Sequence, residues 1–424
     1  MPRRAATSIL LTALLVAGCE ADSPAGAPPP PATTAATSDL DHLLDQLETI
    51  HPEPFHGVPR ATWVTEMSDL QQQLPELTDD QLVVEVMRLV ALLSREGRDG
   101  HQFALPQPGH EGMALPLRWY ELEGDLVVTE AMAPYADLAG SVVEAVDGTP
   151  VTEVLALAEP LVPRDGPATV SMFRPMLLLR MHVLRGLGIA APDDDSVTLT
   201  VSDGGQSRDV DVAVVPHEDL VAWAGRFGEF RLPERPDVAY RHRLEDVQWS
   251  RWHDDALHVR LTEIQEQPSA ATLRRLEAPD LDRVVLDLRQ NPGGNNGNNH
   301  PWVTALTDVV EGGVPLVVLT DRVTFSAASN LATDLDQAVD PVFVGEPMGG
   351  GLNFWNDVVQ VRLDDLAVPM QVGVSTIYWQ RSSDDDPRLT IRPDLPVPVT
   401  AADVFGGRDP ALRVALGPLP DRLG

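Results

Sequence analysis

The sequence lacks lysine altogether and contains one cysteine. All 31 basic residues of the 424-residue chain are therefore arginines, and no reaction of this protein can use a lysine side chain. Because Cys19 is the only cysteine, the chain has no internal disulfide and no CxxC zinc site. The mature fold also has no cysteine nucleophile if Cys19 is lipidated, as the N-terminus predicts below. The sequence also lacks a Walker loop, a Rossmann glycine fingerprint and an HExxH motif, so we expect no cofactor and no metal.

Positive charge is also scarce. The 64 acidic residues outnumber the basic ones, and the formal net charge is -33. Such a surface repels nucleic acid and anionic lipid headgroups, so we expect neither as a partner. The acidic surplus itself indicates a soluble exterior rather than a specific cationic ligand.

The N-terminus predicts export. Arg3 and Arg4 precede an apolar run over 9–16, which is too short to span a bilayer. The run closes with Val16-Ala17-Gly18-Cys19, which resembles a bacterial lipobox. We therefore expect a signal peptide over 1–18, lipidation of Cys19, and an exported protein anchored to the membrane surface.

The remaining chain divides by composition into four parts. Residues 19–38 are rich in Pro, Ala and Thr and predict an extended linker. Residues 39–105 have helical periodicity, with a cap at Ser38 and a capping box formed by Thr78 and Gln81. Residues 106–220 contain short strand-like runs broken by turns at Asp147-Gly148 and Gly204-Gly205, and 139–148 resembles the core hairpin of a PDZ domain.

Residues 221–424 alternate strands and helices. The apolar runs 284–288 and 315–319 each precede a loop and a helix, and a third run follows at 342–344. This pattern predicts two consecutive βαβ units, and ligands of such α/β sheets collect beyond the carboxyl ends of the strands.

Chemistry-bearing residues follow the first two of these strands. Ser326 is predicted at a helix N-terminus, where free amides favour developing negative charge. The amides of Ala327 and of Gly293 or Gly294 are candidates for an oxyanion hole, because glycine lets the backbone approach a substrate closely. On its own, a serine in this position is more often a helix cap.

Five motifs give the sequence a family resemblance. They are Asp99-Gly100-His101, the DLRxNPGG segment at 287–294, TFSAA at 324–328, VGEPMGG at 344–350, and RPDL at 392–395 with DPAL at 409–412. In this order they resemble the tricorn-core and C-terminal processing (tail-specific) serine protease family. The resemblance implies an α/β fold with a helical N-terminal region, a PDZ-like insert and a crotonase-like catalytic core, and it makes Ser326 the nucleophile.

The family uses either a Ser-Lys dyad or a Ser-His arrangement. Without lysine the dyad cannot be built, so the resemblance implies that His101 is the general base. The acid that would orient His101 stays open. Glu346, Asp99 and the acidic run at 384–386 are the alternatives, within which Asp384 and Asp385 are candidates.

The function predicted from these observations is hydrolysis of peptide bonds through an acyl-Ser326 intermediate, with a peptide or protein as substrate. Gly100 stands where Ser-His members of the family have a serine, and the orienting acid is unassigned, so one alternative is a catalytically inert peptide-binding lipoprotein on the same fold. Because a fold does not fix the substrate, the other alternative is an esterase-type hydrolase. Asp287 and Arg289 are expected to form structural ion pairs rather than to take part in the chemistry.

Overall fold

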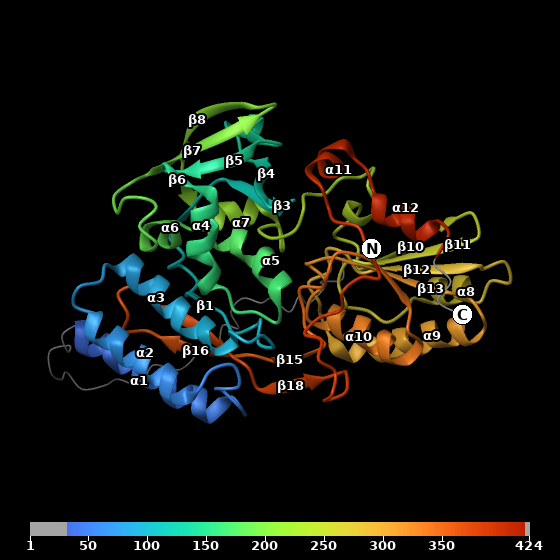
Figure 1. Ribbon diagram of the computed structural model, residues 1–424, viewed down its shortest axis with the longest axis horizontal. Coiled ribbons are helices and arrows are strands. Elements are labelled where there is room, and N and C mark those ends of the chain that lie inside the picture. The colour runs from blue at the N-terminus through green and yellow to red at the C-terminus, as the bar shows by residue number, and fades with distance from the viewer. Residues whose placement is uncertain (1–31, 420–424) are drawn as a thin grey trace, which may run out of the picture.

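The computed structural model describes residues 32–419. The predicted signal peptide, Cys19 and most of the predicted linker lie outside this range. Within it, no helix is both long and apolar enough to cross a membrane. Figure 1 shows two lobes, an N-terminal one of helices and strands and a C-terminal α/β one.

The C-terminal lobe is built on one mixed sheet. Its elements are β10 (Gln248–His253), β11 (Ala256–Leu261), α8 (Ala270–Leu276), β12 (Arg283–Asp287), α9 (Asn299–Glu311), β13 (Leu316–Thr320), α10 (Ala327–Val339), β14 (Val342–Gly345), β19 (Leu395–Pro396), α11 (Ala401–Gly406) and α12 (Pro410–Leu416). The strand order is β10-β11-β12-β13-β14-β19, and every pair except β10–β11 is parallel. The two predicted βαβ units are confirmed as β12-α9-β13 and β13-α10-β14.

Both faces of this sheet are covered, which explains why its strands are apolar throughout. Alternate residues of one strand enter different cores: Val284 and Leu286 pack toward α9 and α10, whereas Val285 packs toward α12. In Figure 1, α9 and α10 lie side by side below the sheet and α12 lies above it. The loops that follow the carboxyl ends of β12 and β13 carry Gly293 and Ser326.

The N-terminal lobe begins with helices. These are α1 (Ala32–Ile50), α2 (Arg60–Gln73) and α3 (Asp79–Ala91). Thr78 and Gln81 form the predicted capping box of α3. One expectation was wrong: α1 already runs through the end of the predicted linker, so Ser38 lies inside a helix rather than at its start. Leu40 of α1 is fully buried, so packing of the apolar face against the core stabilises this helix.

The insert forms an antiparallel sheet with helices against it. Its elements are β2 (Met113–Ala114), β3 (Leu117–Leu122), β4 (Asp125–Ala131), β5 (Val142–Val146), β6 (Thr149–Pro150), α4 (Val151–Ala158), α5 (Pro167–Leu177), α6 (Met181–Gly186), β7 (Ser196–Asp203), β8 (Gln206–Ala213), β9 (Val215–Pro216) and α7 (His217–Ala224). The strand order is β3-β4-β5-β7-β8. The predicted turns at Asp147-Gly148 and Gly204-Gly205 are present, all four residues having positive φ. The PDZ-like assignment itself stays a prediction.

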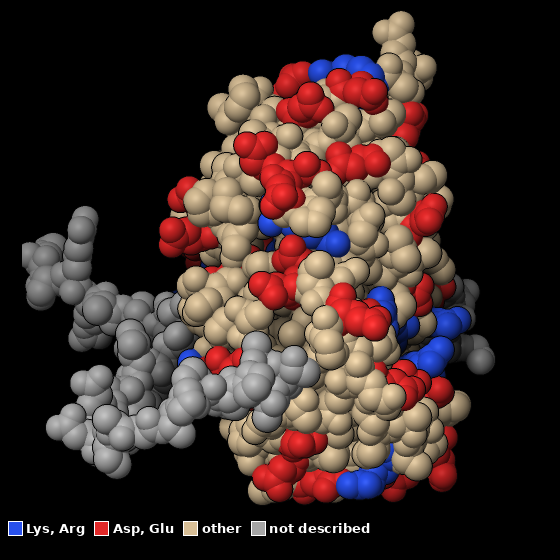
Figure 2. Space-filling model, turned by 90° about the vertical axis from the view of Figure 1, so that its left-hand side faces the viewer, with Lys and Arg blue, Asp and Glu red and all other residues tan. Residues whose placement is uncertain are grey.

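Chain segments far apart in sequence join the lobes. Strand β1 (Ala104–Pro106) pairs with β17 (Met370–Val374), which pairs with β16 (Val359–Leu363), and β15 (Asn353–Asn356) pairs with β18 (Ile377–Gln380). One hydrophobic core contains α1 to α3, the insert and β16–β17 together. The helical region and the insert therefore share a core rather than each having one. Figure 2 shows acidic side chains spread over one face of the molecule, with few basic ones.

Candidate active site

The loops after β12 and β13 meet, as the sequence predicts for neighbouring parallel strands. The Gln290 side chain donates to Asp321 Oδ2 at 2.6 Å, and Phe325 N–H donates to Asn291 O at 3.1 Å. Asp321 also accepts the backbone N–H of Gln290 and of Val323. These bonds fix the turn that carries Ser326.

Ser326 occupies the N-cap position of α10 but does not act as a cap. Its side chain makes no capping hydrogen bond. Its backbone has φ 53° and ψ -125°, a conformation that costs a non-glycine residue on the order of 1–3 kcal/mol and that is concentrated at functional sites. Phe325 and Ala327 on either side are buried, whereas Ser326 is partly exposed. This unfavourable backbone conformation therefore places the Ser326 hydroxyl at the surface of an otherwise buried turn.

The glycine loop lies directly against this serine. Gly293 has φ +110°, and a Cβ there would lie 2.5 Å from Ser326 Cβ and 2.9 Å from Ala327 N. The Gly293 N–H already donates to Asn291 Oδ1 at 2.9 Å, so it is engaged in this state. Ala327 N–H is at the first turn of α10, where amides have no intrahelical acceptor. Gly294 shares the left-handed φ, at +146°, and follows at the same edge.

His101 lies against Phe325, the residue that precedes Ser326. Its ring stacks on Phe325 with centroids 4.3 Å apart and on Phe354 at 5.3 Å. Both ring nitrogens are buried and have no hydrogen-bond partner among the described residues, so the Ser326–His101 hydrogen bond is not formed in this state. Burial lowers the pKa of His101 to about 4, and the negative charge of Asp99 offsets this only in part. His101 is therefore neutral at physiological pH in this state.

Asn356, which the sequence analysis did not identify, makes a side-chain hydrogen bond to the Ser326 hydroxyl. Asn356 Nδ2 donates to Ser326 Oγ at 3.3 Å. Strand β15 presents Phe354 and Asn356 on one face and Trp355 on the other, by the alternation of strand side chains. No motif marks this asparagine; only the path of β15 brings it to the serine.

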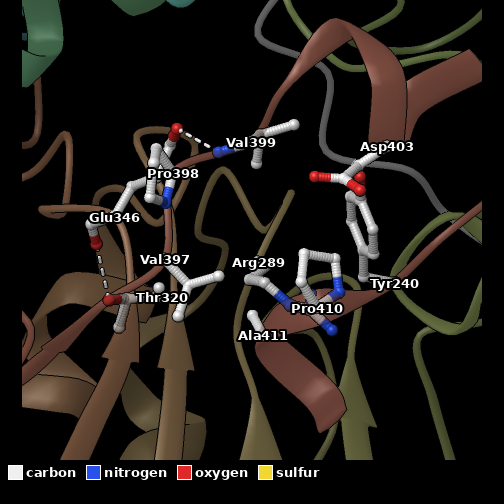
Figure 3. Close-up of a pocket in the computed structure, with 11 residues that line it drawn as sticks. Tyr240, Arg289, Thr320, Glu346, Val397, Pro398, Val399, Asp403, Pro410 and Ala411 are labelled. Atoms are coloured by element: carbon white, nitrogen blue, oxygen red, sulfur yellow. Dashed lines mark hydrogen bonds between the residues drawn. The ribbon is translucent and has the colours of Figure 1, made fainter. Parts of the chain in front are cut away.

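The acids proposed to orient His101 lie elsewhere. Glu346 is buried and forms a bidentate ion pair with Arg322, both N–O distances being 3.0 Å, and it accepts Val399 N–H at 3.0 Å. Burial raises its pKa, but Arg322 outweighs that and lowers it overall. Figure 3 shows Glu346 among the residues that line a cavity of about 10 Å³. Arg289 and Tyr240 line the same cavity. Its contacts are those of a structural ion pair.

The acidic run at 384–386 is on the surface. Asp384 and Asp385 are exposed, and Asp384 accepts from the neighbouring Gln380 side chain. Asp386 pairs with Arg388 at 2.7 Å. None of these carboxylates has a hydrogen bond to His101 within residues 32–419.

Asp99 belongs to a cluster with two histidines. Its Oδ2 lies 3.3 Å from His51 Nε2 and 3.6 Å from His56 Nε2, and its Oδ1 accepts the Ser375 hydroxyl at 2.8 Å. Burial raises the pKa of Asp99, but the hydrogen bond from His51 and the nearby His56 together outweigh burial and lower the pKa overall. Trp355 contacts the His51 ring with centroids 4.5 Å apart. The cluster therefore lies on the Trp355 side of β15, opposite the face that meets Ser326.

Two histidines and a carboxylate resemble a metal-ligand set, and their ligand atoms lie within 4.8 Å of one another. His51 Nδ1, however, accepts Glu53 N–H at 3.0 Å. The proton of the neutral ring is then on Nε2, the atom that faces Asp99. A metal on Nε2 would move that proton to Nδ1, against another donor, whereas ligating histidines normally donate from their second nitrogen. The donor arrangement fits hydrogen bonding better than a metal.

Asp165 is another buried carboxylate near the site, and the sequence analysis did not identify it. Its Oδ1 accepts Gly100 N–H at 2.7 Å and its Oδ2 accepts Gly351 N–H at 3.2 Å. Gly100 precedes His101, and a Cβ on Gly350 would lie 3.2 Å from Ser326 N. A residue of the insert thus holds together the two loops that flank the site. Burial raises the pKa of Asp165 to about 7 although both amide hydrogen bonds oppose the rise.

Asp287 and Arg289 form the predicted structural ion pairs. Arg289 binds Asp287 at 2.7 Å and Asp409 at 2.7 Å, and Asp287 also faces His258 Nε2 at 3.1 Å. All four side chains are largely buried, and together they connect β12 to the start of α12. Their role is to fix the sheet beneath the site.

Comparisons with known proteins support the fold. No family model matches the sequence, and no curated protein is similar to it. Among solved structures, mature CPAF complexed with lactacystin has a TM-score of 0.60 and 15% identity, covering 88% of this chain and 95% of that chain. A serine-to-alanine mutant of CPAF also has a TM-score of 0.60, with 14% identity over 88% of this chain and 94% of that chain. The photosystem II D1 C-terminal processing protease matches at a TM-score of 0.40 and 16% identity, covering 87% and 93%. Over most of its length, this chain therefore has the mixed α/β fold of CPAF.

Proposed function

We propose that the protein is a serine peptidase that uses Ser326 as its nucleophile and His101 as its general base. The observation that carries the proposal is the conformation of Ser326: a strained, partly exposed serine at a helix N-terminus whose hydroxyl caps nothing and against which a left-handed glycine packs. A serine kept only as a cap would have none of these features. The fold shared with CPAF supports the same reading.

The reaction has two halves. Ser326 Oγ attacks the carbonyl carbon of the scissile peptide bond while its proton passes to His101. The tetrahedral oxyanion is stabilised by Ala327 N–H and a glycine-loop amide, and its collapse expels the amine, which takes the proton from His101. Water, deprotonated by His101, then cleaves the acyl-enzyme and restores the serine.

His101 reaches Ser326 only if the hydrogen bonding around the serine changes. Asn356 supplies the one side-chain hydrogen bond to Ser326 Oγ among the described residues, and both His101 nitrogens are unpaired. Because the His101 ring stacks on Phe325 and on Phe354, a small rotation within the ring plane moves a nitrogen without losing the stacking. We expect substrate binding to drive this step.

The location proposed with this activity is a membrane surface of the cell envelope, to which the exported protein is anchored by a lipid. It depends on the lipobox-like segment ending at Cys19, which lies outside the described residues. The insert would hold an extended part of the substrate, as PDZ-like modules do by strand addition.

A fluorophosphonate probe tests the activity, because it labels an activated serine without needing the right substrate. Wild-type protein should be labelled and Ser326→Ala should not. Ser207→Ala, at an exposed serine of β8, is the matched control and should label as wild type does. Folded wild-type protein that stays unlabelled would contradict the proposal.

The unpaired state of His101 favours one alternative, a protein that kept the fold and binds peptides without cleaving them. The same experiment separates the two, since a binder remains unlabelled while still binding peptide.

A further inference from the structure

A groove on the outer side of α9 and α10 has polar groups that the protein itself leaves unsatisfied. The groove has a volume of about 500 Å³, large enough for an amino-acid side chain and its neighbours. Asn299, His300, Asp334, Gln337 and Arg381 are among the residues that line it.

Asn299 is built into the floor of this groove. The residue is 2% exposed, and its Nδ2 donates to Ala327 O at 2.9 Å, which ties it to the first residue of the nucleophile helix. Its Oδ1 is buried and accepts no hydrogen bond from the described residues. An unpaired buried acceptor costs about 1–3 kcal/mol, which a ligand with a donor would recover.

Asp334 provides a second acceptor on the wall. It forms an ion pair with Arg381, whose nearest nitrogen is 3.6 Å away, but it accepts no hydrogen bond within the described chain. The Arg381 guanidinium also lies over the Trp379 ring, 5.0 Å from its centroid. The carboxylate, with a side chain only 20% exposed, is thus partly desolvated and keeps its hydrogen-bonding capacity for a second cation.

Both acceptors are tied to the helix that begins after Ser326, Asn299 through its hydrogen bond to Ala327 O and Asp334 as a residue of α10. Asp334 is on the helix that Ser326 precedes, two turns further along, which is about 10 Å along the helix axis. An extended peptide covers this distance in about three residues at roughly 3.3 Å each. A long side chain from such a residue reaches the groove.

We propose that this groove is a substrate subsite for a basic side chain, lysine or arginine, about three residues from the scissile bond. The ammonium or guanidinium would donate to Asp334 and to Asn299 Oδ1. The net charge of -33 raises the local concentration of cationic peptides and favours the same class. The inference rests on the proposed peptidase function and adds the substrate class to it.

The test measures binding, so that it does not depend on turnover. Three fluorescein-labelled peptides, identical in an uncharged frame except for one central Lys, Gln or Glu, are titrated onto Ser326→Ala protein and followed by anisotropy. The Lys peptide should bind about tenfold more tightly than the Gln peptide, as one charge-assisted hydrogen bond provides. The preference should disappear in Asp334→Asn.

Glu311→Gln is the matched control, since it removes the same charge from an exposed position at the end of α9, outside the groove. It should keep the tenfold preference, and thermal melting should show that both variants are folded. Equal binding of the Lys and Gln peptides would overturn the subsite. An equal loss of the lysine preference in Asp334→Asn and Glu311→Gln would also overturn it, because that result would indicate only long-range attraction. A third contrary result is that the Glu peptide binds most tightly and loses this affinity in Arg381→Gln.

The two proposals fail separately. A labelled Ser326 without lysine preference leaves the peptidase and removes the subsite. A lysine preference without labelling of Ser326 leaves a basic-peptide site on a protein that does not cleave.

Discussion

Replacing Asp165 by asparagine should change how stability depends on pH. The carboxylate is fully buried, and its pKa rises from the model-compound value of 3.8 to about 7 in the folded protein. Because the folded state binds the proton more tightly than the unfolded state, this contribution to stability is fully present below about pH 4. It is lost as the pH rises through the folded pKa, and above that it is constant.

The size of the effect follows from linkage. Each pKa unit corresponds to about 1.36 kcal/mol, so ionisation of Asp165 should cost the wild type about 2–3 kcal/mol more at roughly pH 8 than at roughly pH 5. Asparagine does not titrate. It does lose one acceptor, because its Nδ2 would face Gly100 N–H or Gly351 N–H, at about 1–3 kcal/mol.

We therefore expect Asp165→Asn to be less stable than wild type near pH 5 and about equally stable near pH 8. Urea unfolding at both pH values gives the free energy of unfolding of each protein, and the difference between the two proteins cancels every other titrating group. Asp125→Asn, at an exposed position of β4, should give a difference that does not change with pH. A constant difference for Asp165→Asn would refute the reasoning, because the buried carboxyl would then titrate as it does in the unfolded chain.

Three other outcomes are expected. Gly293→Ala should reduce turnover at least about 100-fold, because its Cβ would displace Ser326, whereas Gly109→Ala, at an equally left-handed glycine with no atom within 4 Å, should have turnover like wild type. His101→Gln should remove nearly all activity, and because burial lowers the pKa of His101 to about 4, wild-type kcat/KM should rise near that pH and stay flat through neutrality; a limb near pH 6.5 would show that the free enzyme is more open than this structure. Cells fed a labelled fatty acid should label the wild type but not Cys19→Ser, and label that persists in the variant would exclude lipidation at that residue.

Local patterns were enough to predict much of the architecture. The apolar run at 284–288 is buried on both faces of a sheet, and that environment is what removes polar residues from it. The Thr78 capping box and the Asp147-Gly148 turn depend on interactions within a few residues, so they could be predicted from the local sequence alone. The meeting of the loops that carry Gly293 and Ser326 followed from parallel pairing of consecutive strands.

Contacts over long sequence separations could not be predicted in this way. Asn356 reaches Ser326, and Asp165 joins Gly100 to Gly351, through pairings that no local pattern encodes. The pKa of His101 is also a tertiary property, since it depends on burial between two aromatic rings.

The amino-acid sequence by itself determined which groups are available: no lysine, one serine on a strand-to-helix turn, and a histidine after Asp99-Gly100. The tertiary structure decided how these groups are charged, strained and paired. The reason is physical: residue identity fixes the chemical group, whereas burial and distance set its protonation, conformation and partners.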